Sequence, residues 1–305
     1  MKLGFVSAIL PELSLEEVLA FAVEEGFDCV EVMCWPSVSS DHRRYAGVTH
    51  IDVENLIDAD VERISALRKA SGVEISGLGY YPNPLTADEA ERKVYLGHIR
   101  KVIAAAARLE IGVMNTFVGR DPKKSIEDNW PAFERLWPLL VRYAEEQGVR
   151  IGIENCPMLF SLDEWPGGKN LAISPEIWRR MFEAIPSPNF GLNLDPSHLV
   201  WQGIDHLRAI HEFSDRLVHI HIKDEKIDRE KLYCRGNLGL KWHDPKIPGL
   251  GDIDWAAFIG ALRAVGYRGA ACIEVEDRAF EDGLEERKQA LRESKRHIDL
   301  AAFRG

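Results

Sequence analysis

The chain has 305 residues, 46% of them hydrophobic, which is enough for one large domain or two ordinary ones. A formal net charge of −11 argues against a nucleic-acid partner, and no run of about 18 apolar residues is present that could span a membrane. Five cysteines without a C-x-x-C pair predict reduced thiols and a cytoplasmic location, not a disulfide framework. The N-terminal segment breaks at Pro11 and turns acidic, unlike a signal or transit peptide.

Short apolar runs alternate with longer segments of helical period along the chain. In order, the apolar runs predict strands at residues 3–7, 29–34, 74–81, 113–119, 150–156, 190–195, 217–224 and 269–277. The segments between and after them predict helices at residues 14–26, 53–70, 86–109, 125–147, from 174 onward, 204–213, 254–266 and 284–302. Two capping boxes, Ser14 with Glu17 and Thr86 with Glu89, are expected to start the first and third helices.

Eight successive strand–helix units in a chain of this size predict an α/β fold, a single (β/α)8 TIM barrel over residues 1–305. A doubly wound open sheet is the alternative, but it would need a glycine-rich phosphate turn after an early strand, and the sequence has none. Long loops at residues 157–173 and 225–253, after strands 5 and 7, are expected to cover an active site.

Acidic and histidine side chains recur near the ends of the last four predicted strands. They are Glu154 on the fifth, Asp195 on the sixth, His219 and His221 on the seventh, and Glu274 and Glu276 on the eighth. Strand residues alternate between faces, so in each strand these polar residues share one face, opposite the aliphatic ones. In a TIM barrel, the carboxyl ends of the strands surround the active site.

Each of these residues alone has an ordinary structural explanation, such as a helix cap, a satisfied core histidine or a surface ion pair. Here such residues occur at matching ends of four consecutive strands. Burying several unpaired charges inside the barrel would cost much free energy, and a bound cation would remove this penalty. Three carboxylates and one imidazole form an oxygen-rich site that suits Mn²⁺, Mg²⁺ or Co²⁺ better than a thiolate zinc site.

The motifs IENCP, LDPSH, VHIHIKD, IPGLGDIDW and CIEVED, in this order, resemble those of the xylose-isomerase-like TIM-barrel superfamily. They are similar to its sugar phosphate isomerase/epimerase type, which includes ketose 3-epimerases and inosose dehydratases. The first half of the chain matches in architecture and in EEGFDCVEV. The resemblance implies a divalent metal, most often Mn²⁺ and otherwise Mg²⁺, Co²⁺ or Zn²⁺, held by Glu154, Asp195, His221 and Glu274.

The resemblance also implies roles for residues around that metal. Glu154 and Glu274 would move protons on opposite faces of a sugar, His198 would contact the substrate, and Asp224 would lie beside it. Where the epimerases carry an arginine six residues after the metal histidine, this chain has Ile227, and the charged segment 225–246 departs from their compact loop.

Aromatic residues such as Trp35 are expected near the same mouth, where rings can stack on sugars or simply pack in the core. Lys223 is a candidate substrate contact. The other basic residues are scattered along the sequence and do not form the cluster that a phosphate group requires, which favours an unphosphorylated sugar or keto-sugar.

Proton removal next to a carbonyl, through a metal-stabilised enediolate, would serve a sugar isomerase or epimerase. The same step followed by loss of a β-substituent would serve a lyase acting on a keto-sugar, keto-glycoside or inosose. A superfamily endonuclease and a non-catalytic sugar-binding subunit are further alternatives, and the negative charge disfavours the endonuclease. The sequence leaves a homo-oligomer open.

Overall fold

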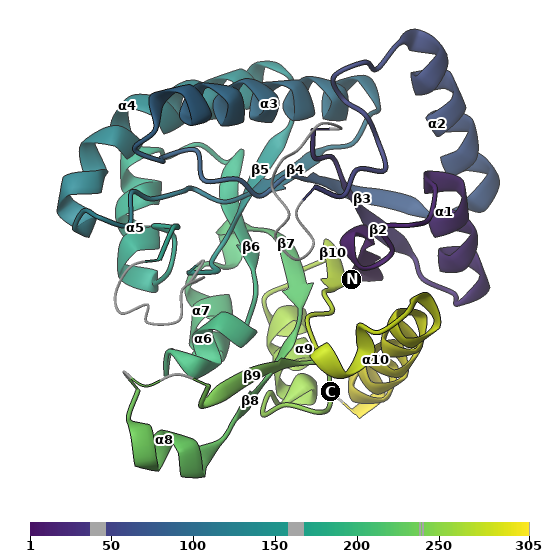
Figure 1. Cartoon of the computed structure of the whole chain (residues 1–305). Helices are drawn as coiled ribbons and strands as arrows, with labels where there is room; N and C mark the ends of the chain where they lie inside the picture. The colour runs from purple at the N-terminus through teal and green to yellow at the C-terminus, as the bar shows by residue number, and fades with distance from the viewer. Residues whose placement is uncertain (37–46, 158–167, 238, 240, 305) are drawn as a thin grey trace.

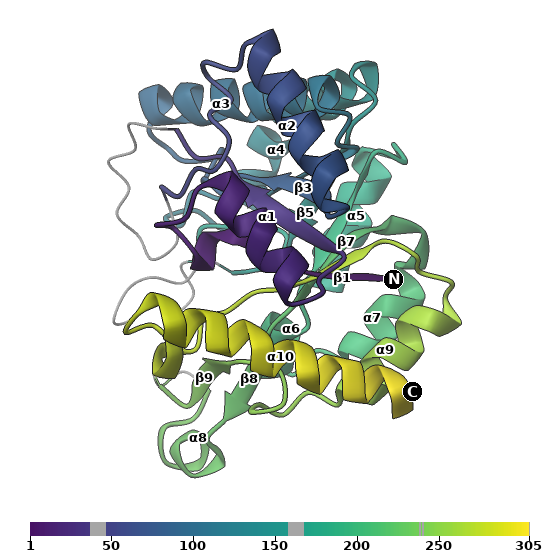
Figure 2. The same cartoon turned by 90° about the vertical axis from the view of Figure 1, so that its right-hand side faces the viewer.

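The computed structural model describes residues 1–36, 47–157, 168–237, 239 and 241–304. Eight parallel strands close into a barrel in the order β1-β10-β7-β6-β5-β4-β3-β2, with helices around the outside (Figures 1 and 2). The strands are β1 Lys2–Val6, β2 Cys29–Met33, β3 Glu74–Gly79, β4 Val113–Thr116, β5 Arg150–Glu154, β6 Phe190–Leu194, β7 Leu217–Ile222 and β10 Ala270–Ile273. The predicted (β/α)8 TIM barrel is therefore confirmed.

The helices of the described residues include the eight that were predicted, with some differences at their ends, and two short ones, at residues 197–201 and 229–235, that were not predicted. They are α1 Leu15–Glu24, α2 Asp58–Ser71, α3 Glu89–Arg108, α4 Ile126–Glu146, α5 Pro175–Ala184, α6 Ser197–Trp201, α7 His206–Glu212, α8 Arg229–Arg235, α9 Trp255–Ala264 and α10 Leu284–Arg304, with 3₁₀ turns η1 Ser7–Ile9, η2 Ser214–Arg216 and η3 Arg278–Phe280. The capping box of Ser14 and Glu17 at α1 is confirmed.

Two predicted helix starts were wrong. Helix α3 is capped by Asp88, whose side chain accepts from the Glu91 amide, so the predicted Thr86 cap lies two residues too early. Helix α2 starts at Asp58 and not near residue 53, because the Asp52 carboxylate accepts from the amides of Glu54 and Asn55 and holds a turn there.

The predicted long loop after the seventh strand contains regular structure. Strands β8 (Asp224–Ile227) and β9 (His243–Lys246) pair as an antiparallel hairpin, and α8 lies between them at its far end (Figure 1). We call residues 224–246 the hairpin arm. Of the other predicted loop, 157–173, residues 158–167 lie outside the described part of the chain.

Alternation along the strands separates an apolar outer layer from a polar interior. Ile151 and Ile153 are fully buried on the outer face of β5. A Cβ built on Gly152, between them, would overlap the Asn115 side chain and approach that of Asn193, so this face of β5 looks into the barrel. Glu154 shares the face of Gly152 and therefore points inward at the mouth.

The core between barrel and helices is anchored by large aromatic side chains. Trp137, Trp178 and Trp255 are among the largest fully buried residues, and their indole N–H groups donate to Val118 O, Ala172 O and Asp224 Oδ2. Their burial therefore leaves no unpaired indole donor. Within the described ranges, no helix has the length and hydrophobicity needed to cross a bilayer.

Candidate metal centre

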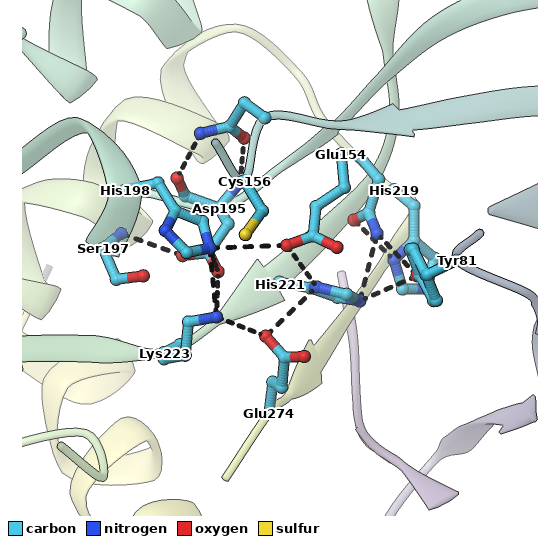
Figure 3. A network of polar contacts seen from close by, with 12 residues as sticks. Tyr81, Glu154, Cys156, Asp195, Ser197, His198, His219, His221, Lys223 and Glu274 are labelled. Atoms are coloured by element: carbon cyan, nitrogen blue, oxygen red, sulfur yellow. Dashed lines mark hydrogen bonds and ion pairs between the residues drawn. The ribbon is translucent and has the colours of Figure 1, made fainter. Parts of the chain in front are cut away.

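Four polar side chains meet where strands β5, β6, β7 and β10 end (Figure 3). Glu154 is the last residue of β5, Asp195 follows β6, His221 is the penultimate residue of β7, and Glu274 follows β10. One potential ligand atom of each lies within 4.8 Å of those of the other three. The structure thus brings together the four residues that the sequence predicts as metal ligands.

Asp195 is held in place by Asn155, the residue that follows β5. The Asn155 side chain accepts from the Asp195 amide at 2.8 Å and donates to the Asp195 carbonyl at 2.9 Å. Asp195 Oδ1 accepts from the Ser197 amide at 2.8 Å, at the start of α6. Only Oδ2 of this buried carboxylate is then left to face the centre, so its direction is fixed before any ligand arrives.

His221 is oriented from the opposite side by Glu31 on β2. His221 Nε2 lies 2.8 Å from Glu31 Oε2, and the Tyr81 hydroxyl donates to Glu31 Oε1. Burial lowers the pKa of His221, but the surrounding carboxylates, Glu31 first, outweigh it and raise that pKa to about 10. Burial raises the pKa of Glu31, but the His221 charge and hydrogen bond outweigh it and lower that pKa to about 2.

The donor atoms fit a divalent metal ion. Within the described part of the chain, His221 Nδ1 is buried and has no hydrogen-bond partner, which is costly unless another group pairs with it. Asp195 Oδ2 is also buried and accepts no hydrogen bond there, although the Lys223 ammonium lies 3.0 Å from it. His221 Nδ1 lies 3.6 Å from Glu274 Oε2 and 3.9 Å from Glu154 Oε1. Three carboxylate oxygens and one imidazole nitrogen are a donor set that Mn²⁺, Mg²⁺, Co²⁺ and Zn²⁺ accept.

Glu154 is the most strongly perturbed carboxyl group of the centre. Burial and the nearby Glu274 carboxylate raise its pKa well above the usual value, although His221 and Lys223 oppose the shift. A bound cation would lower that pKa again, because an opposite charge favours the ionised form. The proton affinity of Glu154 therefore depends on whether a cation is bound.

His198 and Lys223, both predicted substrate contacts, lie beside the four ligands. Lys223 Nζ lies 3.1 Å from His198 Nε2 and donates to Glu274 Oε2 at 2.7 Å. Burial and the Lys223 charge hold the pKa of His198 well below its usual value. His198 is therefore neutral and accepts from Lys223 through Nε2, which places the ring proton on Nδ1.

Two further groups of potential ligands share members with this centre. One combines Glu154 with Cys156 and His198, and the other combines Glu31 with His219 and His221. The second group uses His221 Nε2, which already faces Glu31. Its members therefore orient His221 as a ligand of the first centre and do not form a separate site.

Comparison with known proteins identifies the fold family. The family described as xylose isomerase-like TIM barrel matches residues 19–301. The chain belongs to this family. The xylose isomerase-like chain is 26% identical to the uncharacterized protein YfiH of Bacillus subtilis, over 96% of this chain and 99% of that protein.

Two further relatives carry a named activity. An inosose dehydratase of Geobacillus thermodenitrificans is 32% identical over 36% of this chain and 38% of its own length. A D-psicose 3-epimerase solved in the presence of D-fructose superposes with a TM-score of 0.72 at 16% identity, covering both chains completely. At that identity, the superposition shows the fold alone.

Two other predicted substrate contacts are engaged elsewhere in this xylose isomerase-like barrel. The Asp224 carboxylate accepts from the amides of Glu225, Gly249 and Ile253 and from the Trp255 indole, at 2.9–3.1 Å. The Trp35 ring packs edge-on against Tyr80, with 4.9 Å between ring centres. Asp224 thus fastens the 247–255 segment, and Trp35 packs in the core.

Glu31 and Asn155 contribute to the centre but were not predicted from the sequence. Glu31 lies in the apolar run CVEVM, where a single glutamate suggests an edge or an ion pair. The alternation rule applied to the last four strands would have placed it on the inner face with Cys29 and Met33. Asn155 acts through backbone contacts, which leave no recognisable sequence pattern.

Proposed function

We propose that the protein is a divalent-metal-dependent sugar isomerase or epimerase, with Mn²⁺ as the expected ion. The observation that carries this proposal is the convergence of Glu154, Asp195, His221 and Glu274 at one mouth of the barrel. When bound there, a divalent ion would act as a Lewis acid toward the carbonyl and hydroxyl oxygens of the sugar. The family membership and the epimerase among its structural neighbours support this choice.

Glu154 and Glu274 are the proposed proton-transfer pair. They approach His221 Nδ1 from strands β5 and β10, which are separated in the barrel by β6 and β7. Glu154 would remove the proton next to the carbonyl, and Glu274 would donate a different proton to the carbon from the other side. The raised pKa of Glu154 supports this role, because a carboxylate with a higher proton affinity is a stronger base.

His198 and Lys223 are the proposed contacts to the sugar. The neutral His198 ring and the Lys223 ammonium would hold the oxygen atoms next to the reacting carbon and exclude water from it. Asp224 and Trp35 take no direct part in this proposal, because their side chains hold the 247–255 segment and the core.

The test is solvent exchange catalysed by the metal-loaded protein. The chain would be loaded with Mn²⁺, Mg²⁺, Co²⁺ or Zn²⁺ in D₂O and offered ketoses, aldoses and keto-glycosides, and the products followed by NMR after metal removal. We expect deuterium next to the carbonyl together with an accumulating isomer or epimer. Glu154→Gln and Glu274→Gln should each slow exchange by about 10²–10⁴-fold. Glu176→Gln, at an exposed position on α5, serves as the matched control.

A dehydratase is the second candidate, and the inosose dehydratase relatives favour it. Glu154 would remove the same proton and would then give it to the departing hydroxyl group, which leaves as water. Deuterium incorporation accompanied by loss of water in the same experiment would select this reaction. Absence of exchange with every substrate and every metal would contradict both candidates.

A further inference from the structure

The Lys223 ammonium lies inside the cluster of carboxylates, not at its solvent edge. Its side chain is 2% exposed, and Nζ lies 3.0 Å from Asp195 Oδ2, 2.7 Å from Glu274 Oε2 and 3.0 Å from Glu276 Oε2. Figure 3 shows it reaching toward Asp195 and Glu274 from below His198. Lys223 follows β7, Asp195 follows β6, and Glu274 and Glu276 follow β10, so this one cation joins three parts of the barrel mouth.

The carboxylates around Lys223 favour its charged form. Burial alone would lower its pKa, but the carboxylates of Asp195, Glu274, Glu276 and Glu154 outweigh burial and keep that pKa well above its usual value. A buried ammonium this well paired would leave several uncompensated charges behind if it were removed.

Two of its three carboxylate partners belong to the candidate metal centre. Glu274 Oε2 faces Lys223 at 2.7 Å and His221 Nδ1 at 3.6 Å, so the same oxygen serves both the ammonium and the ligand cluster. Asp195 Oδ2, the oxygen left free by the Ser197 contact, is likewise the one that Lys223 approaches. Glu276 lies outside the ligand group and could keep Lys223 paired when the other oxygens bind an ion.

We propose that Lys223 and the divalent ion compete for the oxygen atoms of Asp195 and Glu274. Lys223 thereby sets how tightly the ion is held, and it stabilises the mouth of the barrel when no ion is bound. The inference rests on the metal centre of the proposed function but not on any substrate or reaction.

The experiment compares Lys223→Met with the wild type in the absence of sugar. Mn²⁺ affinity would be measured by competition with a fluorescent chelator, and melting temperature in EDTA and in excess Mn²⁺. We expect the Kd for Mn²⁺ to fall by about tenfold or more, because a competing positive charge is removed. The melting temperature should fall in EDTA and recover in Mn²⁺. Lys226→Met, on the hairpin arm and 51% exposed, is the control and should change neither quantity.

A second variant separates competition from a general loss of structure. Glu276→Gln removes the carboxylate that lies outside the ligand group. The Lys223 ammonium would then be paired with Asp195 and Glu274 alone and would interact with them more strongly. Its Mn²⁺ affinity should weaken, opposite to that of Lys223→Met. If Lys223→Met folds only with metal, it would be purified in Mn²⁺ and titrated with chelator.

The two proposals fail in different ways. A wild-type chain that binds no divalent ion would overturn the metal centre and this inference together. A wild type that binds Mn²⁺, with an unchanged or weaker affinity in Lys223→Met, would overturn the competition alone. Negative results with every sugar would contradict the proposed reaction and leave the affinity comparison intact.

Discussion

Glu31 determines which nitrogen of His221 faces the carboxylates. It accepts the Nε2 proton at 2.8 Å from across the barrel, and the Tyr81 hydroxyl holds its other oxygen. The ring is therefore fixed with Nδ1 toward Glu154 and Glu274. A carboxylate behind a histidine ligand fixes both its tautomer and its orientation.

We predict that metal binding releases a proton from His221, and that Glu31→Gln reduces this release. With a pKa of about 10, His221 carries protons on both nitrogens at neutral pH, and an ion at Nδ1 must displace one. Without the Glu31 charge that pKa falls, and loss of the orienting contact should weaken Mn²⁺ binding by about 10–100-fold. Calorimetry in buffers of different ionisation enthalpy at pH 7.5 measures both quantities.

Tyr81→Phe is the matched control for this substitution, because it keeps the Glu31 carboxylate and should retain the proton release. Equal proton release from the wild type and Glu31→Gln would show that Glu31 does not govern the protonation of His221.

Strand alternation predicted that polar residues of the last four strands share one face, and the family resemblance selected His221 over His219 and Glu274 over Glu276 as ligands. His198 and Lys223 also lie beside those ligands, as expected. The hydrogen-bond partners of the Asp224 carboxylate could not be predicted. Its donors lie at residues 249, 253 and 255, and only the folded chain brings them close to it.

At the level of elements, Asp224 ties the hairpin arm to the segment that leads into α9. The same carboxylate holds the amides of Gly249 and Ile253 and the Trp255 indole. Gly251 passes so close to it that a Cβ there would overlap Asp224 Oδ1. The motif IPGLGDIDW is therefore explained by packing around one buried acid.

We predict that Asp224→Ala destabilises the protein by about 3 kcal/mol or more, because it leaves several buried donors without an acceptor. Urea unfolding monitored by far-UV circular dichroism measures the change. Asp252→Ala in the same region removes a pair with Lys226 and a hydrogen bond from the Ile227 amide near the surface, and it should cost less, about 1–2 kcal/mol. Similar losses in both variants would contradict the special role of Asp224.

The hairpin arm itself was expected to be a loop. Its strands, DEKI and HDPK, are short and charged, so they show no apolar alternation that could reveal pairing. Side-chain contacts hold the arm in place, one with α6 outside the arm and one between its two strands. His243 stacks on Trp201 of α6, with the rings 7° from parallel and 4.8 Å between centres, and pairs with Glu225 at 2.7 Å.

On the scale of the whole molecule, the barrel could be predicted because its outer strand faces are continuously apolar. The interior is different, since Ser76, Asn193, His219 and Cys272 form a connected polar layer below the candidate metal centre. His219 is fully enclosed there, and burial lowers its pKa from 6.5 to about 4.

We predict that His219 makes the protein less stable as the pH falls from about 6.5 to 4. In this window the unfolded chain takes up a proton on this histidine and the folded chain does not, so stability is lost by up to about 3 kcal/mol. His219→Asn should flatten this part of the stability profile. Urea midpoints at pH 7 and pH 5, measured in EDTA, provide the comparison, and identical pH slopes in the two proteins would rule the effect out.

The chain runs almost directly from the strand that carries His221 into the hairpin arm. Strand β7 ends at Ile222 and β8 begins at Asp224, with Lys223 as the only residue between them. For protein engineering, this means that the arm is not an interchangeable module. Replacing the arm from residue 224 onward would disturb His221, which lies only three residues earlier. Insertions near the exposed Tyr233 on α8 would change the outer end of the arm and leave the metal centre in place.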